Sequence, residues 1–134
     1  MKPKTDIKFS LKPISSKELL ETFKSSGIKR PGNTKRLGKM IKHSNLIVSA
    51  RESGKLVGVA RALTDFSWVC YVSDIAVRKE YQNQGIGKRL VSEIQKILGS
   101  GVMILLVSAP TAEKFYPKIG FQKAKNAWKI PRKS

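Results

Sequence analysis

Apolar positions in the first third of the chain predict one weak strand and two helices. Residues 7–11 alternate weakly between apolar and polar side chains, as an edge strand does. Residues 15–18 have the Ser-x-x-Glu form of a capping box, which predicts a helix that ends at Gly27. After the Pro-Gly pair at 31–32, a second short helix is expected. Its cap is Asn33 or Thr34, and its apolar face consists of Leu37, Met40 and Ile41.

Short apolar runs in the middle of the chain are typical of β structure. Residues 46–50 and 56–60 flank a turn at 52–55 that contains a glycine, and this pattern predicts a β-hairpin. The link at 65–67 then leads to a longer apolar strand at about 69–77. Three neighbouring strands are therefore expected in this part of the chain.

A helix and a further strand follow the strand at 69–77. Residues 87–98 place their apolar side chains on one face, which predicts an amphipathic helix, and residues 102–107 form another apolar run. A strand-helix-strand connection of this length makes the two strands parallel, through a right-handed crossover. The tail after Phe121 is basic and is expected to add a last antiparallel strand, anchored by Trp128 and Ile130.

The length and the rare residues limit the class of protein. A chain of 134 residues is expected to form one domain, 1–134, that buries about two thirds of its unfolded surface. Cys70 and His43 are the only residues of their types, so an internal disulfide and a cysteine-histidine metal site are excluded. The first six residues are polar, and no apolar run approaches the roughly 18 residues of a membrane span. We therefore expect no metal, no membrane and a cytoplasmic location.

The net charge is strongly positive. The chain has 27 Lys and Arg against 9 Asp and Glu, which gives a formal charge of +18. A basic surface keeps a protein soluble and attracts polyanionic ligands. The alternative is nucleic-acid or ribosome binding, but the basic residues form no dense run and no nucleic-acid-binding motif accompanies them. Specific nucleic-acid recognition is therefore not favoured, whereas non-specific binding at low salt is expected.

The loop between the apolar strand and the helix predicts an anion site. Glycines at 85 and 87 let the backbone approach a ligand, and the first amides of the helix have no carbonyl partners within the helix. A P-loop would need glycine at position 82 and Ser or Thr at position 89, which are Gln82 and Arg89. A dinucleotide fingerprint would need a third glycine where Leu90 stands. Both of these phosphate-binding motifs are excluded.

The remaining pattern, Gln-x-x-Gly-x-Gly from Gln82 to Gly87, resembles the coenzyme A pyrophosphate loop of the GNAT N-acetyltransferase superfamily. A second motif resembles the same family about 30 residues downstream. There, residues 111–121 carry a Phe-Tyr pair on a short predicted helix and then a Gly-Phe pair. The resemblance spans residues 46–121. It implies an α/β (α+β) fold with a mixed, mostly antiparallel central sheet, a parallel pair of strands splayed at the cofactor cleft, and helices on both faces.

The resemblance also implies an activity and a cosubstrate. It identifies a small single-domain N-acetyltransferase that moves an acetyl group directly from acetyl-CoA to a primary amine, without a metal. The strand before the loop would face the acetyl group and the pantetheine arm, and the loop and helix start would surround the pyrophosphate. The residues at the matching positions are Ile75, Ala76 and Val77 on the strand, Gln82, Gln84, Gly85, Ile86, Gly87, Lys88 and Arg89 at the loop, and Ala112 and Phe115 beside them.

Two side chains are candidates for proton transfer. Tyr116 matches the tyrosine that many family members use to protonate the departing thiolate, and a phenol with a pKa of about 10 can donate to a thiolate whose conjugate acid lies near 8.5. Packing of Tyr116 and Phe115 on the sheet is the structural alternative. Asp74 is the only acidic residue on the central strand and is the candidate base for the amine. Pairing with a lysine or capping of a loop is the alternative for Asp74.

The acceptor and the assembly stay open at this stage. Residues 61–77 look most like small arylalkylamine and general amine acetyltransferases, and a monoamine or a peptide amine is preferred over a polycation because the surface is basic. Homodimers are common in the family, so a homodimer is possible. The alternative from another class is a non-catalytic acyl-CoA-binding or RNA- or ribosome-associated module of the same fold. That alternative predicts salt-sensitive RNA binding without acetyl transfer.

Overall fold

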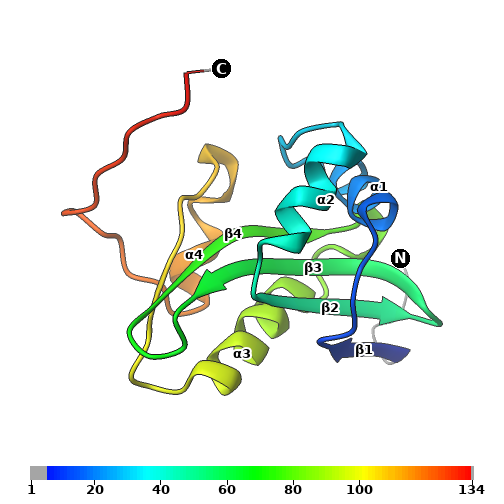
Figure 1. The fold of residues 1–134 in the computed structure, drawn as a ribbon. Coiled ribbons are helices and arrows are strands. Elements are labelled where there is room, and N and C mark those ends of the chain that lie inside the picture. Colours follow the sequence, from blue (N-terminus) through cyan, green and yellow to red (C-terminus); the bar gives the residue numbers. More distant parts are fainter. Residues whose placement is uncertain (1–5, 134) are drawn as a thin grey trace.

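A computed structural model describes residues 6–133, so five of the first six residues of the polar N-terminus lie outside the described part. Five strands form one sheet in chain order (Figure 1). The first four are antiparallel, and β4 and β5 are parallel, as the sequence predicted. The strands are β1 (Ile7–Ser10), β2 (Leu46–Glu52), β3 (Lys55–Thr64), β4 (Val69–Val77) and β5 (Met103–Leu105).

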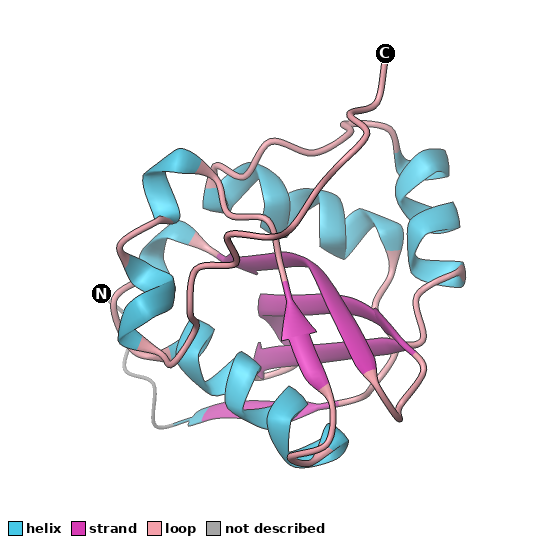
Figure 2. Ribbon diagram, turned by 90° about the vertical axis from the view of Figure 1, so that its left-hand side faces the viewer, coloured by secondary structure: helices cyan, strands magenta, loops and turns pink. Residues whose placement is uncertain are grey.

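Helices cover both faces of this sheet (Figures 1 and 2). One hydrophobic cluster joins α1 and α2 to the sheet through Leu19 and Leu37, and the other joins α3 to the opposite face through Leu90 and Ile94. Burial of these apolar faces is the main force that holds the helices on the sheet. The helices are α1 (Ser16–Ser26), α2 (Thr34–Lys42), α3 (Ile86–Leu98) and the short α4 (Phe115–Lys118), with 3-10 turns η2 (Lys79–Tyr81) and η3 (Pro110–Ala112).

Local signals set the helix ends. Ser15 and Glu18 form the predicted capping box of α1, and Gly27 ends that helix in the left-handed conformation at φ 85°. Asn33, rather than Thr34, caps α2 through its side-chain oxygen. In both helices the capping side chain accepts hydrogen bonds from amides within three residues of it, which is why the sequence could predict these caps.

A β-bulge in the middle of β4 changes which residues face which helix. Arg61 of β3 pairs with Asp74, but the next residue, Ala62, pairs with Val72, so Ser73 is the extra residue. Val72 packs against the α3 side, whereas Ala76 packs against the α1 side. The bulge thus turns Asp74 toward the face covered by α1 and α2. Strict alternation along β4 would not have placed it there.

The parallel pair is short, and the two strands separate early. Only Val69, Cys70 and Tyr71 of β4 pair with β5, so β5 is shorter than the predicted run at 102–107. From Val72 to Val77, the edge of β4 that would face β5 has no strand beside it. This is the expected splay, and it opens one edge of β4 beside the loop at 82–87.

The prediction for the tail was wrong. Residues 122–133 form no strand, and the trace leaves the sheet after α4 and rises on the side of α2 (Figure 1). Trp128 and Ile130 are each 94% exposed, so they anchor nothing in this chain. Lys and Arg make up five of the thirteen residues from 122 to 134. This segment therefore has too little apolar surface to offset the entropy lost when a further strand is ordered.

Candidate active site

The N-terminus of α3 is built to leave its amides open. Gly85 is the N-cap in the left-handed conformation at φ 83°, and no side chain caps this helix, unlike α1 and α2. The first helical hydrogen bond runs from the Arg89 amide to the Gly85 carbonyl at 3.0 Å. The amides before Arg89 therefore lack carbonyl partners in the helix, and they stand at the positive end of its dipole. This arrangement suits an anion.

The two glutamines of the loop do different things. The Gln82 side-chain amide donates to the Val77 carbonyl at 2.9 Å, so it ties the loop back to the end of β4. The Gln84 side-chain oxygen is buried and accepts no hydrogen bond from any described residue. Because an unpartnered buried acceptor is costly, an N–H donor that reached this oxygen would stabilise the loop. Gln82 thus holds the loop against the end of β4, whereas Gln84 carries an acceptor that no described residue uses.

Gly87 brings the two sequence motifs together. A Cβ added at Gly87 would lie 3.2 Å from Cζ of Phe115, so the absence of a side chain lets α4 pack on the first turn of α3. Ala112 lies half-buried in η3, the turn before α4. The pyrophosphate-type loop and the Phe-Tyr motif are therefore neighbours in space, although about 30 residues separate them in sequence.

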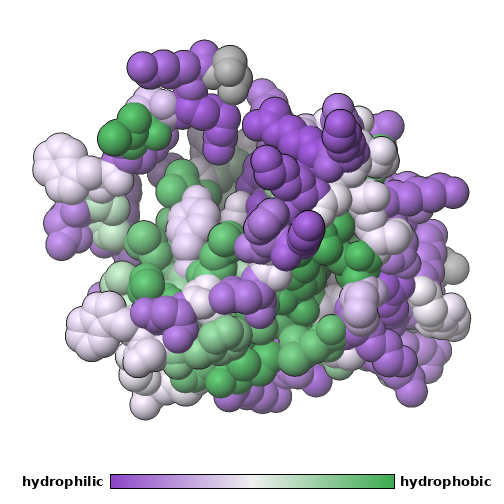
Figure 3. Space-filling model, viewed as in Figure 1, coloured by the Kyte–Doolittle hydropathy of each residue, from purple (hydrophilic) through white to green (hydrophobic). Residues whose placement is uncertain are grey.

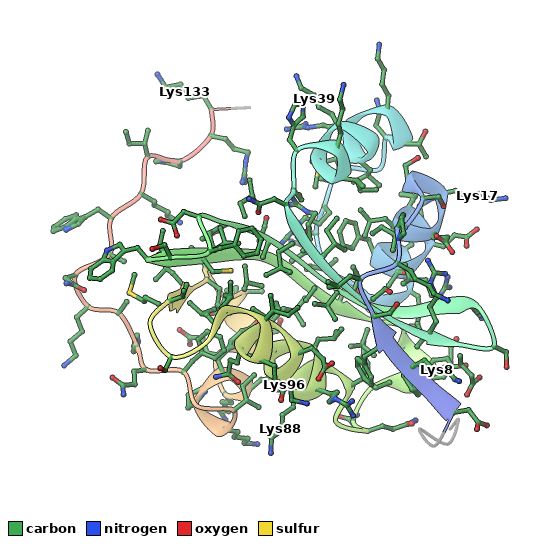
Figure 4. All side chains as sticks on the ribbon, turned by 60° about the horizontal axis from the view of Figure 1, so that its bottom comes forward. Lys8, Lys17, Lys39, Lys88, Lys96 and Lys133 are labelled. Atoms are coloured by element: carbon green, nitrogen blue, oxygen red, sulfur yellow. The ribbon has the colours of Figure 1, made fainter. Side chains whose placement is uncertain are left out.

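The two basic residues at the start of α3 are not equivalent. Lys88 is exposed and reaches into solvent from α3 (Figure 4). Arg89 donates to Glu93 at 3.2 Å, and its guanidinium lies 4.7 Å from the centroid of the Phe9 ring, on the side of β1. Arg89 is thus already engaged by a carboxylate and a ring. Lys88 forms no ion pair with any residue between 6 and 133.

The unpaired edge of β4 runs toward the same loop. Ile75, Ala76 and Val77 pair with β3 on one side only, and beyond Tyr71 no strand pairs with the other side of β4. Ile75 and Val77 pack toward α3, whereas Ala76 packs toward α1. An open strand edge offers backbone donors and acceptors to an extended ligand. The predicted strand residues and the predicted loop residues therefore form one continuous surface.

Asp74 lies at the centre of a buried ion cluster. Its side chain is 0% exposed, and its two oxygens accept hydrogen bonds from Nε of Arg30 and from Nε of Arg61, each at 2.5 Å. Arg61 also donates to the hydroxyls of Ser44 and Ser73, and Arg30 also donates to the Ser73 carbonyl at 2.8 Å. Asp74 therefore pairs with basic residues, which was the alternative to a base role, but its partners are two arginines and not a lysine. A carboxylate held in this way is not open to an amine from solvent.

Sequence reasoning missed both arginines of this cluster. Arg61 is the one charged residue within the apolar part of β3 that follows Lys55, and a lone charge in a buried strand is a signal that could have been used. Arg30 lies in the loop between α1 and α2, 44 residues before Asp74, and carries no comparable signal. Only the folded chain brings Arg30 to the strand.

Tyr116 lies half-buried on α4 between two other rings. Its ring packs edge-on against the rings of Phe115 and Phe121, with distances between ring centroids of 5.2 Å and 5.5 Å. Burial raises the pKa of the Tyr116 phenol, and the positive charge of Arg30 partly offsets this effect. The hydroxyl is therefore protonated at neutral pH, within electrostatic range of the Arg30–Asp74–Arg61 cluster. The packing role and a proton-donating role are both compatible with this position.

Other features of the chain lie away from these residues. Cys70 is buried in the core on the α3 side, and burial raises the pKa of its thiol, as expected of a structural cysteine. One shallow hollow of about 270 Å³ lies between the segment that follows β1 and the end of α2, and another of about 300 Å³ lies beside Trp68 and Met103. Neither hollow is lined by the loop at 82–87 or by Tyr116.

Two features are absent from residues 6–133. No group of three or more His, Cys, Asp or Glu side chains in this range is arranged to hold a metal ion. No helix in the same range is both long enough and apolar enough to cross a membrane.

Comparison with known proteins decides the family. The family described as "Acetyltransferase (GNAT) domain" matches residues 11–129. The chain belongs to the GNAT acetyltransferase family. It is 33% identical over 119 residues to the "Uncharacterized N-acetyltransferase ycf52" of Porphyra purpurea, a match that covers 84% of this chain and 67% of the relative. It is also 33% identical over 75 residues to "GCN5-related N-acetyltransferase 2, chloroplastic" of Arabidopsis thaliana, which covers 54% of this chain and 29% of the relative.

Solved structures of GNAT proteins share the fold. A putative acetyltransferase from Deinococcus radiodurans superposes with a TM-score of 0.80 at 23% identity, over 98% of this chain and 92% of the other. The aminoglycoside N-acetyltransferase AAC(6')-Iy, solved in complex with CoA, superposes with a TM-score of 0.68 at 14% identity, over 96% of this chain and 95% of the other. These likenesses confirm the GNAT fold, with its one parallel pair of strands.

Proposed function

We propose that this GNAT acetyltransferase uses acetyl-CoA and moves the acetyl group directly to a primary amine. The observation that carries the proposal is the uncapped N-terminus of α3 behind the left-handed Gly85, next to the open edge of β4. A pyrophosphate needs several amide donors and positive charge, and this helix end supplies both. The cytoplasmic location and the possible homodimer stay predictions.

The residues of the chain fit each part of the cosubstrate. The amides of residues 85–88 and the side chain of Lys88 would hold the pyrophosphate, while the unpaired edge at Ile75–Val77 would hold the amide-bearing pantetheine arm. The buried oxygen of Gln84 would accept one N–H, and Phe115 would close the side of the loop at Gly87. Bound acetyl-CoA supplies an activated thioester.

Two groups of the chain would handle the charges that develop in the reaction. A backbone amide of β4 beside the bulge at Ser73 would stabilise the negative charge on the carbonyl oxygen. Tyr116, protonated at neutral pH, would give its proton to the leaving thiolate. The base role of Asp74 is not carried further, because both of its oxygens are bound by arginines and its side chain is 0% exposed. We propose that the amine reaches the site neutral, that after its attack on the thioester carbonyl it loses one proton to water, and that Tyr116 regains its proton from water.

The test is calorimetric titration of the full chain with acetyl-CoA at two salt concentrations, followed by thiol release with a panel of amines. Binding together with thiol release supports the proposal. Binding without thiol release by any amine favours the non-catalytic acyl-CoA-binding alternative. Absence of binding contradicts the assignment of the loop.

A pair of matched glycine variants makes this test specific. Gly85→Val and Gly54→Val both place a β-branched residue at a φ near 84°, one in the loop and one in the turn between β2 and β3. The backbone strain is of the same kind in both, about 1–2 kcal/mol. We expect Gly85→Val alone to lose acetyl-CoA binding. Equal loss in both variants would mean that strain, and not the loop, is responsible.

A further inference from the structure

More than half of the basic residues lie in two segments that contain no acidic residue. Residues 22–51 and 114–134 together hold fifteen of the 27 Lys and Arg and none of the nine Asp and Glu. The first segment runs from the end of α1 through α2 to β2, and the second consists of α4 and the tail. The basic residues form no dense run, but more than half of them lie in segments where no acidic residue of the same segment offsets their charge.

The fold brings these two segments to the same side of the molecule. In Figure 1, α2 and the tail rise from the same face of the sheet, with β4 running below them. Figure 4 shows Lys133 on the tail and Lys39 on α2, with Lys8 and Lys17 farther from the tail, and Figure 3 shows hydrophilic residues over α2 and along much of the tail. Arg30 of the first segment is close enough to Tyr116 of the second to affect the pKa of its phenol. Tyr116 itself belongs to the second segment, so the two segments come together near its phenol.

Most of this positive charge is not neutralised. Among residues 6–133, the ion pairs formed by the two segments are those of Arg30 with Asp74 and Arg51 with Glu18. The remaining lysines and arginines of the segments have no acidic partner in that range. Asp74 is outnumbered by its own two arginines, and Glu113, just before α4, is a single exposed charge. A cationic acceptor finds no free cluster of carboxylates here.

An electropositive site also favours a particular kind of amine. Among the described residues, the exposed carboxylate closest to Tyr116 in sequence is the single Glu113, and the surrounding positive charge disfavours an ammonium ion, so the site favours an amine that is readily neutral. A peptide α-amine has a pKa of about 7.7–8.0, whereas a lysine side chain has a pKa of about 10.4. At neutral pH a far larger fraction of the α-amine is neutral. The site thus suits an α-amine with negative charge elsewhere in the same molecule.

We infer, on the basis of the proposed acetyltransferase function, that the acceptor is the N-terminal amine of an acidic peptide or protein segment. The amine would lie at Tyr116, and the acidic residues behind it would lie along the basic surface of α2 and the tail. This surface extends along a helix and a tail of more than ten residues, which fits a chain better than a small molecule. A nucleic acid has the required charge but lacks an aliphatic primary amine.

The experiment compares peptides that share one N-terminal residue and differ in the next four. One series is acidic, one is neutral and one is basic, and a fourth is the acidic peptide with a blocked N-terminus and one internal lysine. The rate of acetyl transfer at low substrate gives kcat/KM at 50 and 300 mM salt. We expect the acidic peptide to exceed the neutral one by at least tenfold at low salt and the advantage to shrink at high salt. The basic and the blocked peptides should be the poorest.

Charge-reversal variants locate the effect. Arg36→Glu with Lys39→Glu changes exposed positions of α2, and Lys8→Glu with Lys17→Glu makes the same change in charge at exposed positions away from the tail. Lys, Arg and Glu have similar helix propensities, so α2 is expected to stay folded. The α2 variant should lose the preference for the acidic peptide, and the control variant should keep it.

The failure of this inference is distinct from the failure of the proposed function. Equal or better rates with neutral or basic peptides, while acetyl-CoA still binds and thiol is released, would overturn only the acidic acceptor. Tight, salt-sensitive binding of a single-stranded oligonucleotide that the α2 variant abolishes, with no peptide preference, would assign the surface to nucleic acid instead. Loss of acetyl-CoA binding in the unmodified chain would overturn the function itself.

Discussion

The substitution Asp74→Asn tests the ion cluster and the role of Asp74 together. It keeps the shape of the side chain but removes the negative charge that faces two guanidinium groups. Arg61 has 7% of its side chain exposed and Arg30 has 27%, so Arg61 would be left as a buried cation without a carboxylate. Removing one partner of a buried pair costs about 3–5 kcal/mol. The asparagine oxygen keeps one acceptor, and Arg30 can regain water, so we expect a loss of about 3 kcal/mol.

Urea unfolding followed by circular dichroism measures this loss. Glu113→Gln is the matched control, because it removes one carboxylate from an exposed position without an ion pair among the described residues. A second variant, Asp74→Asn with Arg61→Gln, should be less destabilised than the sum of the two single variants, since the two side chains interact directly. A loss below about 1 kcal/mol for Asp74→Asn, or full additivity, would refute the view that this cluster is a buried, mutually compensated unit.

The same variant separates a structural role from a base role. If Asp74 only holds Arg30 and Arg61, the folded fraction of Asp74→Asn should keep the pH profile of kcat/KM that the unmodified chain has. If Asp74 is the base for the amine, kcat should fall by about 10²-fold or more and the acidic limb of the profile should disappear. Measurement at low temperature, where the variant is folded, keeps the two effects apart.

Other variants test single features of the structure. Tyr116→Phe should lower kcat by about 10²-fold while calorimetric binding of acetyl-CoA is nearly unchanged, and an unchanged kcat would remove Tyr116 from the chemistry. Gly87→Ala should weaken packing of α4, because its Cβ would lie 3.2 Å from Phe115, whereas Gly38→Ala, with open space around it, should be tolerated or stabilising. Arg51 lowers the pKa of Glu18 to about 2, so the contribution of this pair to stability is present above pH 4.5 and is lost as the pH falls toward 2. Acid unfolding of Glu18→Gln should therefore show a smaller loss of stability between these pH values, and a curve parallel to that of the unmodified chain would contradict this.

Local signals account for the parts of the fold that the sequence predicted well. The cap at Ser15, the stop at Gly27 and the left-handed Gly85 depend on hydrogen bonds and backbone angles within a few residues. The loop from Gln82 to Gly87 is likewise a local motif, so its place between a strand and a helix could be recognised without a structure. Apolar periodicity was enough to find the helices and the strands that pack on both faces of the sheet.

Side-chain directions at the site could not be predicted in the same way. The bulge at Ser73 shifts the register of β4 by one residue, and a shift of one residue turns every later side chain to the other face. Gln82 ties the loop to Val77, and Arg89 turns to Glu93 and Phe9, although both were expected around the pyrophosphate. The directions of these side chains depend on neighbours that are distant in sequence, or on competition between several polar partners.

The sequence by itself determined the family, the order of the elements and the position of the glycine-containing loop from Gln82 to Gly87, because these follow from composition, periodicity and short motifs. Only the tertiary structure decided what surrounds Asp74 and where the positive charge gathers. Arg30 reaches Asp74 across 44 residues of chain, and the two acid-free segments come together near the Tyr116 phenol only when α2 packs on the sheet and α4 packs on α3. Electrostatic energies depend on distance and burial, and a linear sequence contains neither.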